Sequence, residues 1–341
     1  DGVIDQTDAK TRVEIPAGTA QMQNFANWFQ YHRSRINATK AIIGRTINNT
    51  DASRMGLRWY NLGHRVNSTS MSDPAQKRAL LQELYGIVIG GNGTPARRAL
   101  LNTAIYFTDA SGSGPILSAA DGGECQQNFS ILMSDGFWNG GNPGVGNADI
   151  DGGSYNTIFD GNAAQSNDGG NYADPYSNTL ADVAMAIYEV DLRGDLANSV
   201  PTQAGVDEND QQHLVSYTIA FGLKGQLDPA AADPLSIGFS WPEAQADQNT
   251  TVDDMWHAAY NGRGKFLSAQ NPATLQESLS AAITDISERT GTAAAVAINS
   301  AQLSLESVVY LAQFNSNRWQ GNLLAFPIID TDTGELAATP R

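Results

Sequence analysis

One apolar run that ends in an acidic residue constrains this chain more than any other feature. Residues Asn128–Asn139 read NFSILMSDGFWN. The apolar part is too short for a helix and has the length of a buried strand. It ends in Ser-Asp-Gly, which places Asp135 at the carboxyl end of the strand, where ligands bind in open α/β sheets. The run therefore predicts a ligand-binding edge at Asp135.

Charge and hydropathy exclude two classes of protein. The 341 residues include 20 basic and 36 acidic side chains, which gives a formal net charge of −16. No cluster of Lys or Arg stands out, so nucleic acid is a poor partner. The longest apolar runs, such as Thr292–Ile298, are far too short to span a membrane. The 33 glycines and 13 prolines, with abundant Asn, Ser and Thr, are typical of a loop-rich secreted protein.

Helical and strand patterns alternate as far as about residue 290. This alternation predicts a mainly parallel sheet with helices on both faces. Two polar insertions, near residues 139–175 and 226–252, are long enough to be functional loops. The predicted strands are Arg54–Leu62, Phe129–Ser134, His213–Leu223 and Gly264–Ala269. The predicted helices are Asn24–Ile47, Ser72 or Asp73 to about Gly86, Pro95–Phe107, Ser177–Leu192, Asp253–Tyr260 and Asn271–Glu288.

The pattern changes after Thr290. Val308–Phe314 and Gly321–Ile329 alternate like strands, and a DTDTG turn at residues 330–334 follows them, which predicts hairpins. We therefore divide the chain into residues 1–290, an α/β domain, and residues 291–341, a linker with an all-β segment. That segment ends before it can bury a core, and Trp319 and Phe326 are its expected anchors.

Seven stretches of the chain, in order, carry a family pattern. They are NFANWFQYHRSR, GGNGTPARRALLNTAIYF, CQQNFSILMSDGFWNG, YADPYSNTLADVAMAIYEVDLR, HLVSYTIAFGL, MWHAAYNGRGKFLSAQNP and VVYLAQFNSNRWQGNLLAF. These stretches resemble the PilY-type adhesin and assembly factors at the tip of bacterial type IV pili. The resemblance implies a von Willebrand factor A-like domain, a doubly wound and mainly parallel sheet, over residues 1–290. It also implies the truncated start of a C-terminal β-propeller over residues 291–341.

The family's A-like domain carries a metal-ion-dependent adhesion site. Its pattern has a D-x-S-x-S loop after the first strand, a Thr from a second loop and an Asp after the fourth strand, because a hard divalent cation binds oxygen ligands. By resemblance, Thr94 and Asp135 are metal ligands and the cation is Mg or Ca. Neither an apolar strand nor D-x-S-x-S precedes Asn24. We therefore expect the first strand to lie outside these residues or to be missing, and the metal site to be incomplete.

Several of these residues have a structural alternative. Thr94 is also placed to cap the helix that starts at Pro95, and Asp135 to form a turn. A literal D-x-S-x-S match at Asp109–Ser113 is interpreted as an ordinary turn, because a helix precedes it and loop residues follow it. We also expect aromatic residues such as Trp28, Phe29, Trp256 and Trp319 to be core residues.

The acidic part of the first insertion contains Asp149, Asp151, Asp160 and Asp168, and N-A-D-I-D-G-G resembles the start of a calcium loop. No Glu occupies the closing twelfth position of such a loop. A solvated loop is therefore the favoured interpretation.

Other chemistries find little support. The histidines, His32, His64, His213 and His257, lack the spacing of a zinc site. The chain has no G-x-S-x-G elbow. Cys125 is the only cysteine, so it cannot form an internal disulfide. We expect its partner to lie outside these residues, because thiols in oxidising compartments usually find one.

These features predict a non-enzymatic binding and assembly protein. By resemblance it is exported through the periplasm to the pilus tip at the cell surface, primes pilin assembly, and contacts host or abiotic surfaces. Its partners would be major and minor pilins and a surface ligand. The competing hypothesis is a secreted calcium-dependent structural or matrix protein with no pilus role. A hydrolase that uses Asp135 and a bound metal ranks third, because no base accompanies that carboxylate.

Overall fold

The structure is a computed structural model that divides into two compact units, Asp1–Ala282 and Ile283–Arg341, each described by itself. The described residues are 14–32, 34–51, 53–60, 65–88, 93–135, 137–150, 170–291, 297–298, 308–315 and 320–327.

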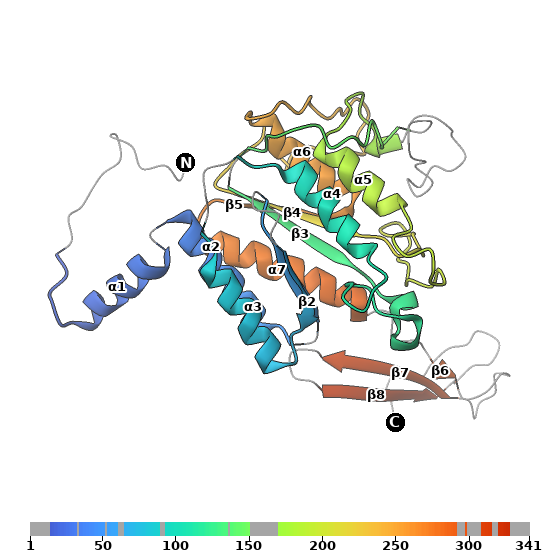
Figure 1. The fold of residues 1–341 in the computed structure, drawn as a ribbon, viewed down its shortest axis with the longest axis horizontal. Coiled ribbons are helices and arrows are strands. Elements are labelled where there is room, and N and C mark those ends of the chain that lie inside the picture. The colour runs from blue at the N-terminus through green and yellow to red at the C-terminus, as the bar shows by residue number, and fades with distance from the viewer. Residues whose placement is uncertain are drawn as a thin grey trace. The chain divides into compact units, whose positions relative to one another are not determined.

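A three-stranded parallel sheet forms the centre of the first unit (Figure 1). Its strands are β3 (Phe129–Ser134), β4 (Val215–Phe221) and β5 (Arg263–Ala269), in the order β3-β4-β5. In register, Leu132 lies beside Thr218. All seven residues of β4 are buried, as expected for a central parallel strand that is covered on both faces.

Helices cover both faces of this sheet. One face packs against α4 (Ala96–Phe107), α5 (Leu180–Glu189) and α6 (Thr250–Asn261). The other face packs against α2 (Arg35–Asn49) and α7 (Pro272–Gly291). The predicted α/β class with a parallel sheet is therefore confirmed. The side chains alternate between the two cores: Leu132 and Ala220 face the first, and Ile131, Met133, Ile219 and Phe221 the second.

The strand predicted at Arg54–Leu62 does not join the parallel sheet, so that part of the prediction is wrong. Instead β1 (Arg54–Arg58) pairs antiparallel with β2 (Arg65–Ser70) in a separate two-stranded sheet. The sequence of β2, RVNSTS, is mostly polar and gave no strand signal. The hairpin packs on α3 (Pro74–Gly86) around Met71, Leu80 and Leu84.

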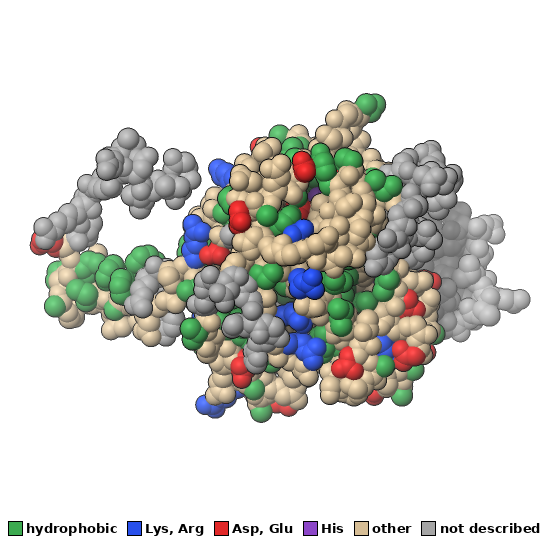
Figure 2. Space-filling view, turned by 45° about the horizontal axis from the view of Figure 1, so that its top comes forward, with side chains coloured by type: hydrophobic (Ala, Val, Ile, Leu, Met, Phe, Trp, Pro, Cys, Tyr) green, Lys and Arg blue, Asp and Glu red, His purple; other side chains and the backbone are tan. Residues whose placement is uncertain are grey.

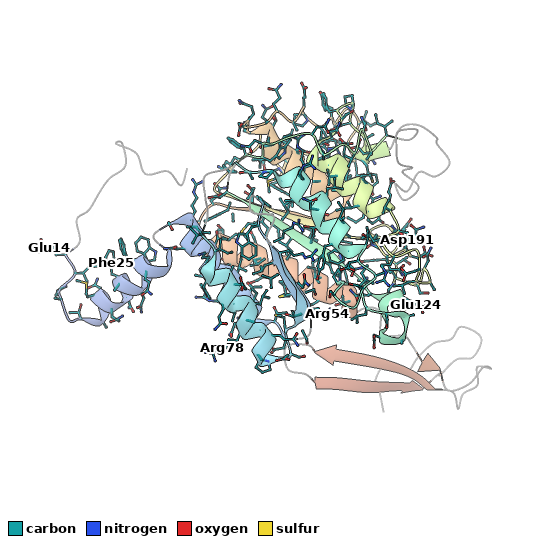
Figure 3. The ribbon with its side chains drawn as sticks, in the orientation of Figure 1. Glu14, Phe25, Arg54, Arg78, Glu124 and Asp191 are labelled. Carbon is teal, nitrogen blue, oxygen red and sulfur yellow. The ribbon has the colours of Figure 1, made fainter. Side chains whose placement is uncertain are left out.

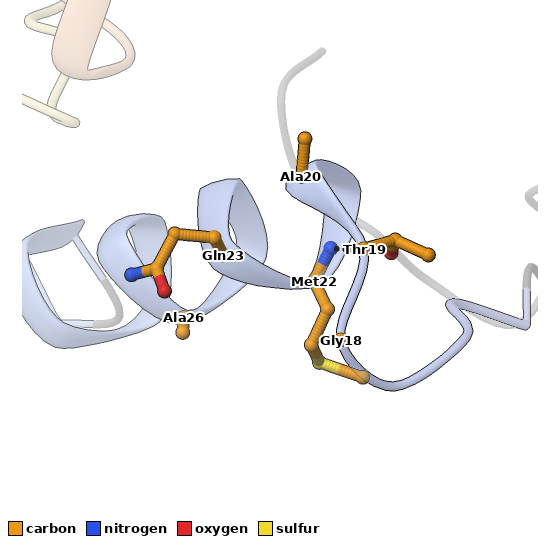
Figure 4. A pocket seen from close by; sticks show the side chains of 6 residues that line it. All are labelled: Gly18, Thr19, Ala20, Met22, Gln23 and Ala26. Atoms are coloured by element: carbon orange, nitrogen blue, oxygen red, sulfur yellow. Dashed lines mark hydrogen bonds between the residues drawn. The ribbon is translucent and has the colours of Figure 1, made fainter.

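The single helix predicted over Asn24–Ile47 is in fact two helices, α1 (Ala20–His32) and α2. Ser34 has an extended backbone and its side chain accepts a hydrogen bond from the Asn37 amide, so it caps α2. The aromatic side chains of α1, Phe25, Trp28 and Phe29, are about half exposed, at 45%, 51% and 47%. The expectation that Trp28 and Phe29 are core residues is therefore wrong. Figure 2 shows hydrophobic side chains gathered on this helix, and Phe25 is labelled on it in Figure 3.

Local signals placed several elements well. The helix α3 begins at Pro74 after its cap Asp73, and β3 has the predicted bounds. The helix α5 begins later than predicted because Thr179 forms a capping box with Asp182. The described part of the unit also contains short 3-10 helices at η1 (Ala119–Asp121), η2 (Gly123–Cys125) and η3 (Gly170–Tyr172).

The second unit contains an antiparallel sheet of β6 (Ala297–Ile298), β7 (Val308–Asn315) and β8 (Gln320–Pro327). The predicted hairpin is confirmed for β7 and β8. The DTDTG turn, Trp319 and residues 1–13 lie outside the described residues. The domain division at residues 290 and 291 and the propeller assignment stay predictions. Across the described residues, the helices are too short or too polar to cross a membrane.

Candidate functional site

The carboxyl edge of the parallel sheet holds the residue that the sequence predicted. Asp135 directly follows β3 and is exposed. The Arg35 guanidinium donates to the Asp135 carbonyl oxygen at 3.0 Å. It also lies beside the end of β4, because a Cβ built on Gly222 would be 3.6 Å from Arg35 Cζ. The edge therefore combines an exposed carboxylate with a fixed cation over two strand ends.

A buried tyrosine supports β3 from the side. The Tyr60 hydroxyl donates to the Met133 carbonyl oxygen at 2.6 Å. Burial, with a smaller contribution from the Asp135 carboxylate, raises the pKa of Tyr60 far above its usual range. Tyr60 is therefore a neutral hydrogen-bond donor that fixes the end of β3.

The loop that carries Thr94 lies against the loop after β3. The Thr94 amide donates to Asn139 Oδ1 at 2.8 Å, and the Asn139 amide donates to the Thr94 carbonyl at 3.0 Å. Asn139 is held in turn by Asp247, which accepts from its Nδ2 at 2.9 Å. Thr94 does not cap the next helix, because the cap position is Pro95 and α4 has no side-chain cap hydrogen bond. The capping alternative for Thr94 is therefore wrong.

These two loops do not by themselves complete a site for a hard cation. Calcium takes about 6–8 oxygen ligands, whereas the two predicted ligands supply one hydroxyl, from Thr94, and one carboxylate, from Asp135. The Arg35 guanidinium next to Asp135 adds a positive charge that opposes a cation. Metal binding by Thr94 and Asp135 stays a prediction.

The D-x-S-x-S match at Asp109–Ser113 is a turn, as the sequence predicted. Asp109 Oδ1 accepts from the Ser111 amide at 2.9 Å, and the Gly114 amide donates to the Ser111 carbonyl at 2.9 Å. It follows the end of α4 at Phe107. Its carboxylate is used locally, so it contributes nothing to the sheet edge.

A second group of polar residues lies buried away from that edge, and the sequence did not predict it. One carboxylate oxygen each of Asp149 and Asp174 and one ring nitrogen of His257 lie within 4.8 Å of one another. The Nε2 atom of His257 is 3.5 Å from Asp149 Oδ2, and its Nδ1 atom is 3.4 Å from Asp174 Oδ2. The Trp241 ring stacks on the imidazole with centroids 4.1 Å apart. We call these three residues the buried Asp–His cluster.

Burial and charge shift the titration of the buried Asp–His cluster. Burial raises the pKa of Asp149 to about 8, with His257 opposing the shift and neighbouring carboxylates adding to it. For His257, burial lowers the pKa but the hydrogen bond to Asp174 and the two carboxylates outweigh it, so the pKa rises. The pKa of Asp149 therefore rises mainly because burial disfavours the charged carboxylate, whereas the pKa of His257 rises because the neighbouring carboxylates favour the charged imidazolium.

The interpretation of the first insertion as a solvated loop is wrong at Asp149. Its side chain is 0% exposed, accepts from the Asp174 amide at 3.1 Å, and accepts from Asn261 Nδ2 at 2.9 Å. Asp151, Asp160 and Asp168 lie outside the described residues. Asp149, Asp174 and His257 come from distant positions in the sequence, so no motif of closely spaced ligands joins them.

Curated proteins with similar sequences come from Pseudomonas aeruginosa. Three are named "Type IV pilus biogenesis factor PilY1": from strain PAK at 30% identity over 94% of this chain, from PAO1 at 27% over 92%, and from UCBPP-PA14 at 29% over 93%. This chain is related to the PilY1 proteins. The predicted resemblance to the PilY-type family is therefore confirmed.

The relationship to PilY1 covers nearly all of this chain but a smaller part of each relative. The chain spans about a third of their length, 31%, 31% and 30%. No family model matches the chain. The solved structure "conserved hypothetical protein BatB from Bacteroides thetaiotaomicron" aligns with 76% of this chain and 92% of its own at 11% identity. Its TM-score of 0.39 is too low to show a shared fold.

Proposed function

We propose that this chain is the binding part of a type IV pilus biogenesis factor that acts as an adhesin at the pilus tip and primes pilin assembly. The observation that carries the proposal is the relationship to PilY1 proteins along 94% of the chain. Its partners would be major and minor pilins and a host or abiotic surface ligand. Its location would be the bacterial surface, reached through the periplasm.

The sheet supports a von Willebrand A-like binding domain. Its parallel strands are covered by helices on both faces, and ligands of such sheets bind at the carboxyl ends of the strands. Asp135 is exposed there, and a hydrogen bond from the Thr94 amide to Asn139 holds the Thr94 loop against the loop that follows β3. In an intact protein that supplies the D-x-S-x-S loop, Thr94 and Asp135 would complete a site for Mg or Ca and for an acidic partner group.

The chemistry of this edge fits binding better than catalysis. A hydrolase needs a nucleophile or activated water with a base within hydrogen-bond reach. Within the described residues, the side chain fixed closest to Asp135 by a hydrogen bond is Arg35, which cannot act as a base at neutral pH. We therefore propose that the chain is not an enzyme.

The proposal can be tested in the organism that encodes the protein. Deletion of the gene should remove surface pili, which shearing and electron microscopy would count, and the wild-type gene should restore them. Asp135→Ala in the full-length protein should leave the protein exported and reduce adherence to surfaces. Asp210→Ala, at an exposed aspartate in the loop before β4, is the matched control and should adhere like wild type.

The competing function is a secreted calcium-dependent structural or matrix protein. It predicts that the deletion strain keeps normal pili and that the protein is found in the medium or matrix. Normal piliation and normal adherence in the deletion strain would contradict the proposed function.

A further inference from the structure

The buried Asp–His cluster brings three side chains of metal-ligand type together away from water. Asp149 is 0% exposed, Asp174 is 6% exposed and His257 is 1% exposed. One carboxylate oxygen of each aspartate and one ring nitrogen of His257 lie within 4.8 Å of one another. Buried ionisable side chains are usually paired with one another or bound to a metal ion.

A neighbouring amide gives an independent indication of a missing ligand. Asn261 is 0% exposed, and its Nδ2 donates to Asp149 Oδ2 at 2.9 Å. Its Oδ1 atom is buried and has no hydrogen-bond partner within the described part of the chain. A half-turn of the amide would place this oxygen next to Asp149 Oδ2, at the loss of the hydrogen bonds that Nδ2 donates to Asp149 and, at 3.4 Å, to the Ala181 carbonyl. A cation shared by the two oxygens would offset that loss. Buried polar atoms are nearly always satisfied, so the unpaired oxygen of a side chain that contacts Asp149 points to a ligand at this place.

We propose that the buried Asp–His cluster, with Asn261, binds one divalent transition-metal ion of the zinc or manganese type. An ion on His257 Nε2 would take Asp149 as its carboxylate ligand, because these atoms are 3.5 Å apart. Two ligands at about 2.0–2.2 Å from one ion are separated by such a distance. Asp174 would then accept from Nδ1–H, now 3.4 Å away, and orient the ring, as carboxylates do beside metal-bound histidines.

The donor set selects the class of metal. Calcium and magnesium bind oxygen ligands, whereas imidazole nitrogen suits zinc and other first-row transition ions, and carboxylate oxygen also suits manganese. A set of one imidazole, one or two carboxylates and an amide oxygen therefore favours zinc or manganese over calcium. This site is separate from the sheet edge at Asp135, and its ligands do not include Thr94 or Asp135.

The competing state is a metal-free imidazolium that donates from both nitrogens. In that state Nε2–H donates to the Tyr172 carbonyl, 2.6 Å away, and Nδ1–H to Asp174. It explains the short contact to Tyr172, but it leaves the Asn261 oxygen unpaired. The metal-bound state would give this oxygen a partner.

A bound ion would fasten the first insertion to the helical layer. Asp149 lies at one described end of this insertion and Asp174 at the other, while His257 and Asn261 belong to α6. One ion would thus join both ends of a long surface segment to a buried helix. Its role would be structural, and it would hold the insertion in place for binding.

The test uses the tag-free protein, stripped with a chelator and titrated with Zn²⁺ alone by calorimetry, with bound metal counted by mass spectrometry. Asp149→Asn and His257→Gln should each remove one zinc equivalent or weaken it on the order of 100-fold. His213→Gln is the matched control, because His213 is also buried beside an aspartate, Asp207 at 3.2 Å, but lies outside the cluster. It should bind zinc like wild type. Circular dichroism would check that each variant folds.

A second variant and a spectroscopic measurement keep the result decisive. Asp135→Asn should leave the zinc equivalent intact, whereas loss of zinc in Asp135→Asn but not in Asp149→Asn would overturn the proposal in favour of the sheet edge. If the cluster variants do not fold, electron spin echo spectroscopy of Mn²⁺ bound to the wild type tests whether an imidazole coordinates the ion. Nitrogen modulation from a bound imidazole, absent in no-protein controls, would support the site. Failure of the stripped wild type to bind zinc or manganese at millimolar concentration would overturn it.

Discussion

The buried carboxylate of Asp254 holds α6 to the start of α5. Its side chain is 3% exposed and accepts three hydrogen bonds. Trp138 Nε1 donates to it at 2.8 Å, the Leu180 amide at 2.8 Å and the Ala181 amide at 3.0 Å. The two amides belong to the first turn of α5, where backbone donors lack partners within the helix. Asp254→Ala would leave all three donors buried and unpaired.

The expected cost follows from these contacts. A buried donor without a partner costs about 1–3 kcal/mol, so three of them cost about 3–9 kcal/mol, or about 6 kcal/mol at the middle of that range. Against this stands the burial of the carboxylate itself, which raises the pKa of Asp254 to about 6. Relative to an ordinary pKa near 3.9, ionisation of that group at neutral pH costs about 3 kcal/mol. From the middle of the first range, the net destabilisation of Asp254→Ala should therefore be about 3 kcal/mol.

Asp254→Asn separates the two contributions. It removes the buried charge but keeps one carbonyl oxygen that accepts hydrogen bonds. One or two of the three hydrogen bonds should therefore be lost. We expect about 1 kcal/mol of destabilisation, because each net hydrogen bond is worth about that much. The two variants should therefore differ in their free energy of unfolding by at least about 1 kcal/mol.

Urea unfolding followed by tryptophan fluorescence at neutral pH gives the free energy of unfolding from the midpoint and slope. Asp210→Ala, an exposed aspartate, is the control and should change the free energy of unfolding by less than about 0.5 kcal/mol. The reasoning is refuted if Asp254→Ala stays within about 1 kcal/mol of wild type, or if Asp254→Asn is as damaging as Asp254→Ala.

Three further predictions concern pH, a glycine and the cysteine. Burial raises the pKa of Asp149 to about 8, so the folded state holds a proton that the unfolded state has lost. The unfolding free energy of metal-free protein should therefore fall as pH rises from about 4 to about 8, and Asp149→Asn should flatten the urea-midpoint profile; an unchanged slope contradicts this. Gly222 has φ +74°, so Gly222→Ala should lower the free energy of unfolding by about 1–2 kcal/mol in the same urea assay. Gly86 lies in open space at the end of α3, so Gly86→Ala should leave the free energy of unfolding unchanged or raise it. Equal effects of the two substitutions would refute the backbone argument. Cys125 is free and exposed, so a maleimide should label it without denaturant; a native protein that resists labelling contradicts this.

Short-range signals explain which elements were predictable. The strand β3 was found because its apolar run is short and ends in Ser-Asp-Gly, although only Leu132 and Ser134 are fully buried. The start of α3 was found because Asp73 and Pro74 form a cap and a first turn. Each signal lies within a few residues of the element that it defines, so no tertiary information was needed.

The misses arise where tertiary contacts decide. The strand β1 has a strand-like pattern, but its partner β2 is polar, and pairing between them moves β1 out of the parallel sheet. The break between α1 and α2 was missed because Ser34 is one residue in a long apolar pattern. The burial of Asp149 was missed because its partners, Asn261 and the Asp174 amide, are 112 and 25 residues away.

One signal in the sequence did point to the missed group, and it lies on α6. Its polar residues Asp253, Asp254, His257 and Asn261 recur at helical spacing, and all four are buried. An exposed amphipathic helix would turn these residues to water, so their burial requires partners from elsewhere in the chain. Asp253 accepts from the amides of Gln226 and Leu227 at the start of the second insertion.

The same helix therefore holds both insertions and the start of α5. His257 and Asn261 face the described ends of the first insertion, Asp253 holds the second, and Asp254 holds α5. These attachments are made to α6, and Asn139 and Asp247 add a contact between the two insertions beside the Thr94 loop. Loop sequences on such a scaffold can change without disturbing the sheet. We therefore expect substitutions in the insertions to change what the protein binds. Substitutions on the polar face of α6 should instead prevent folding.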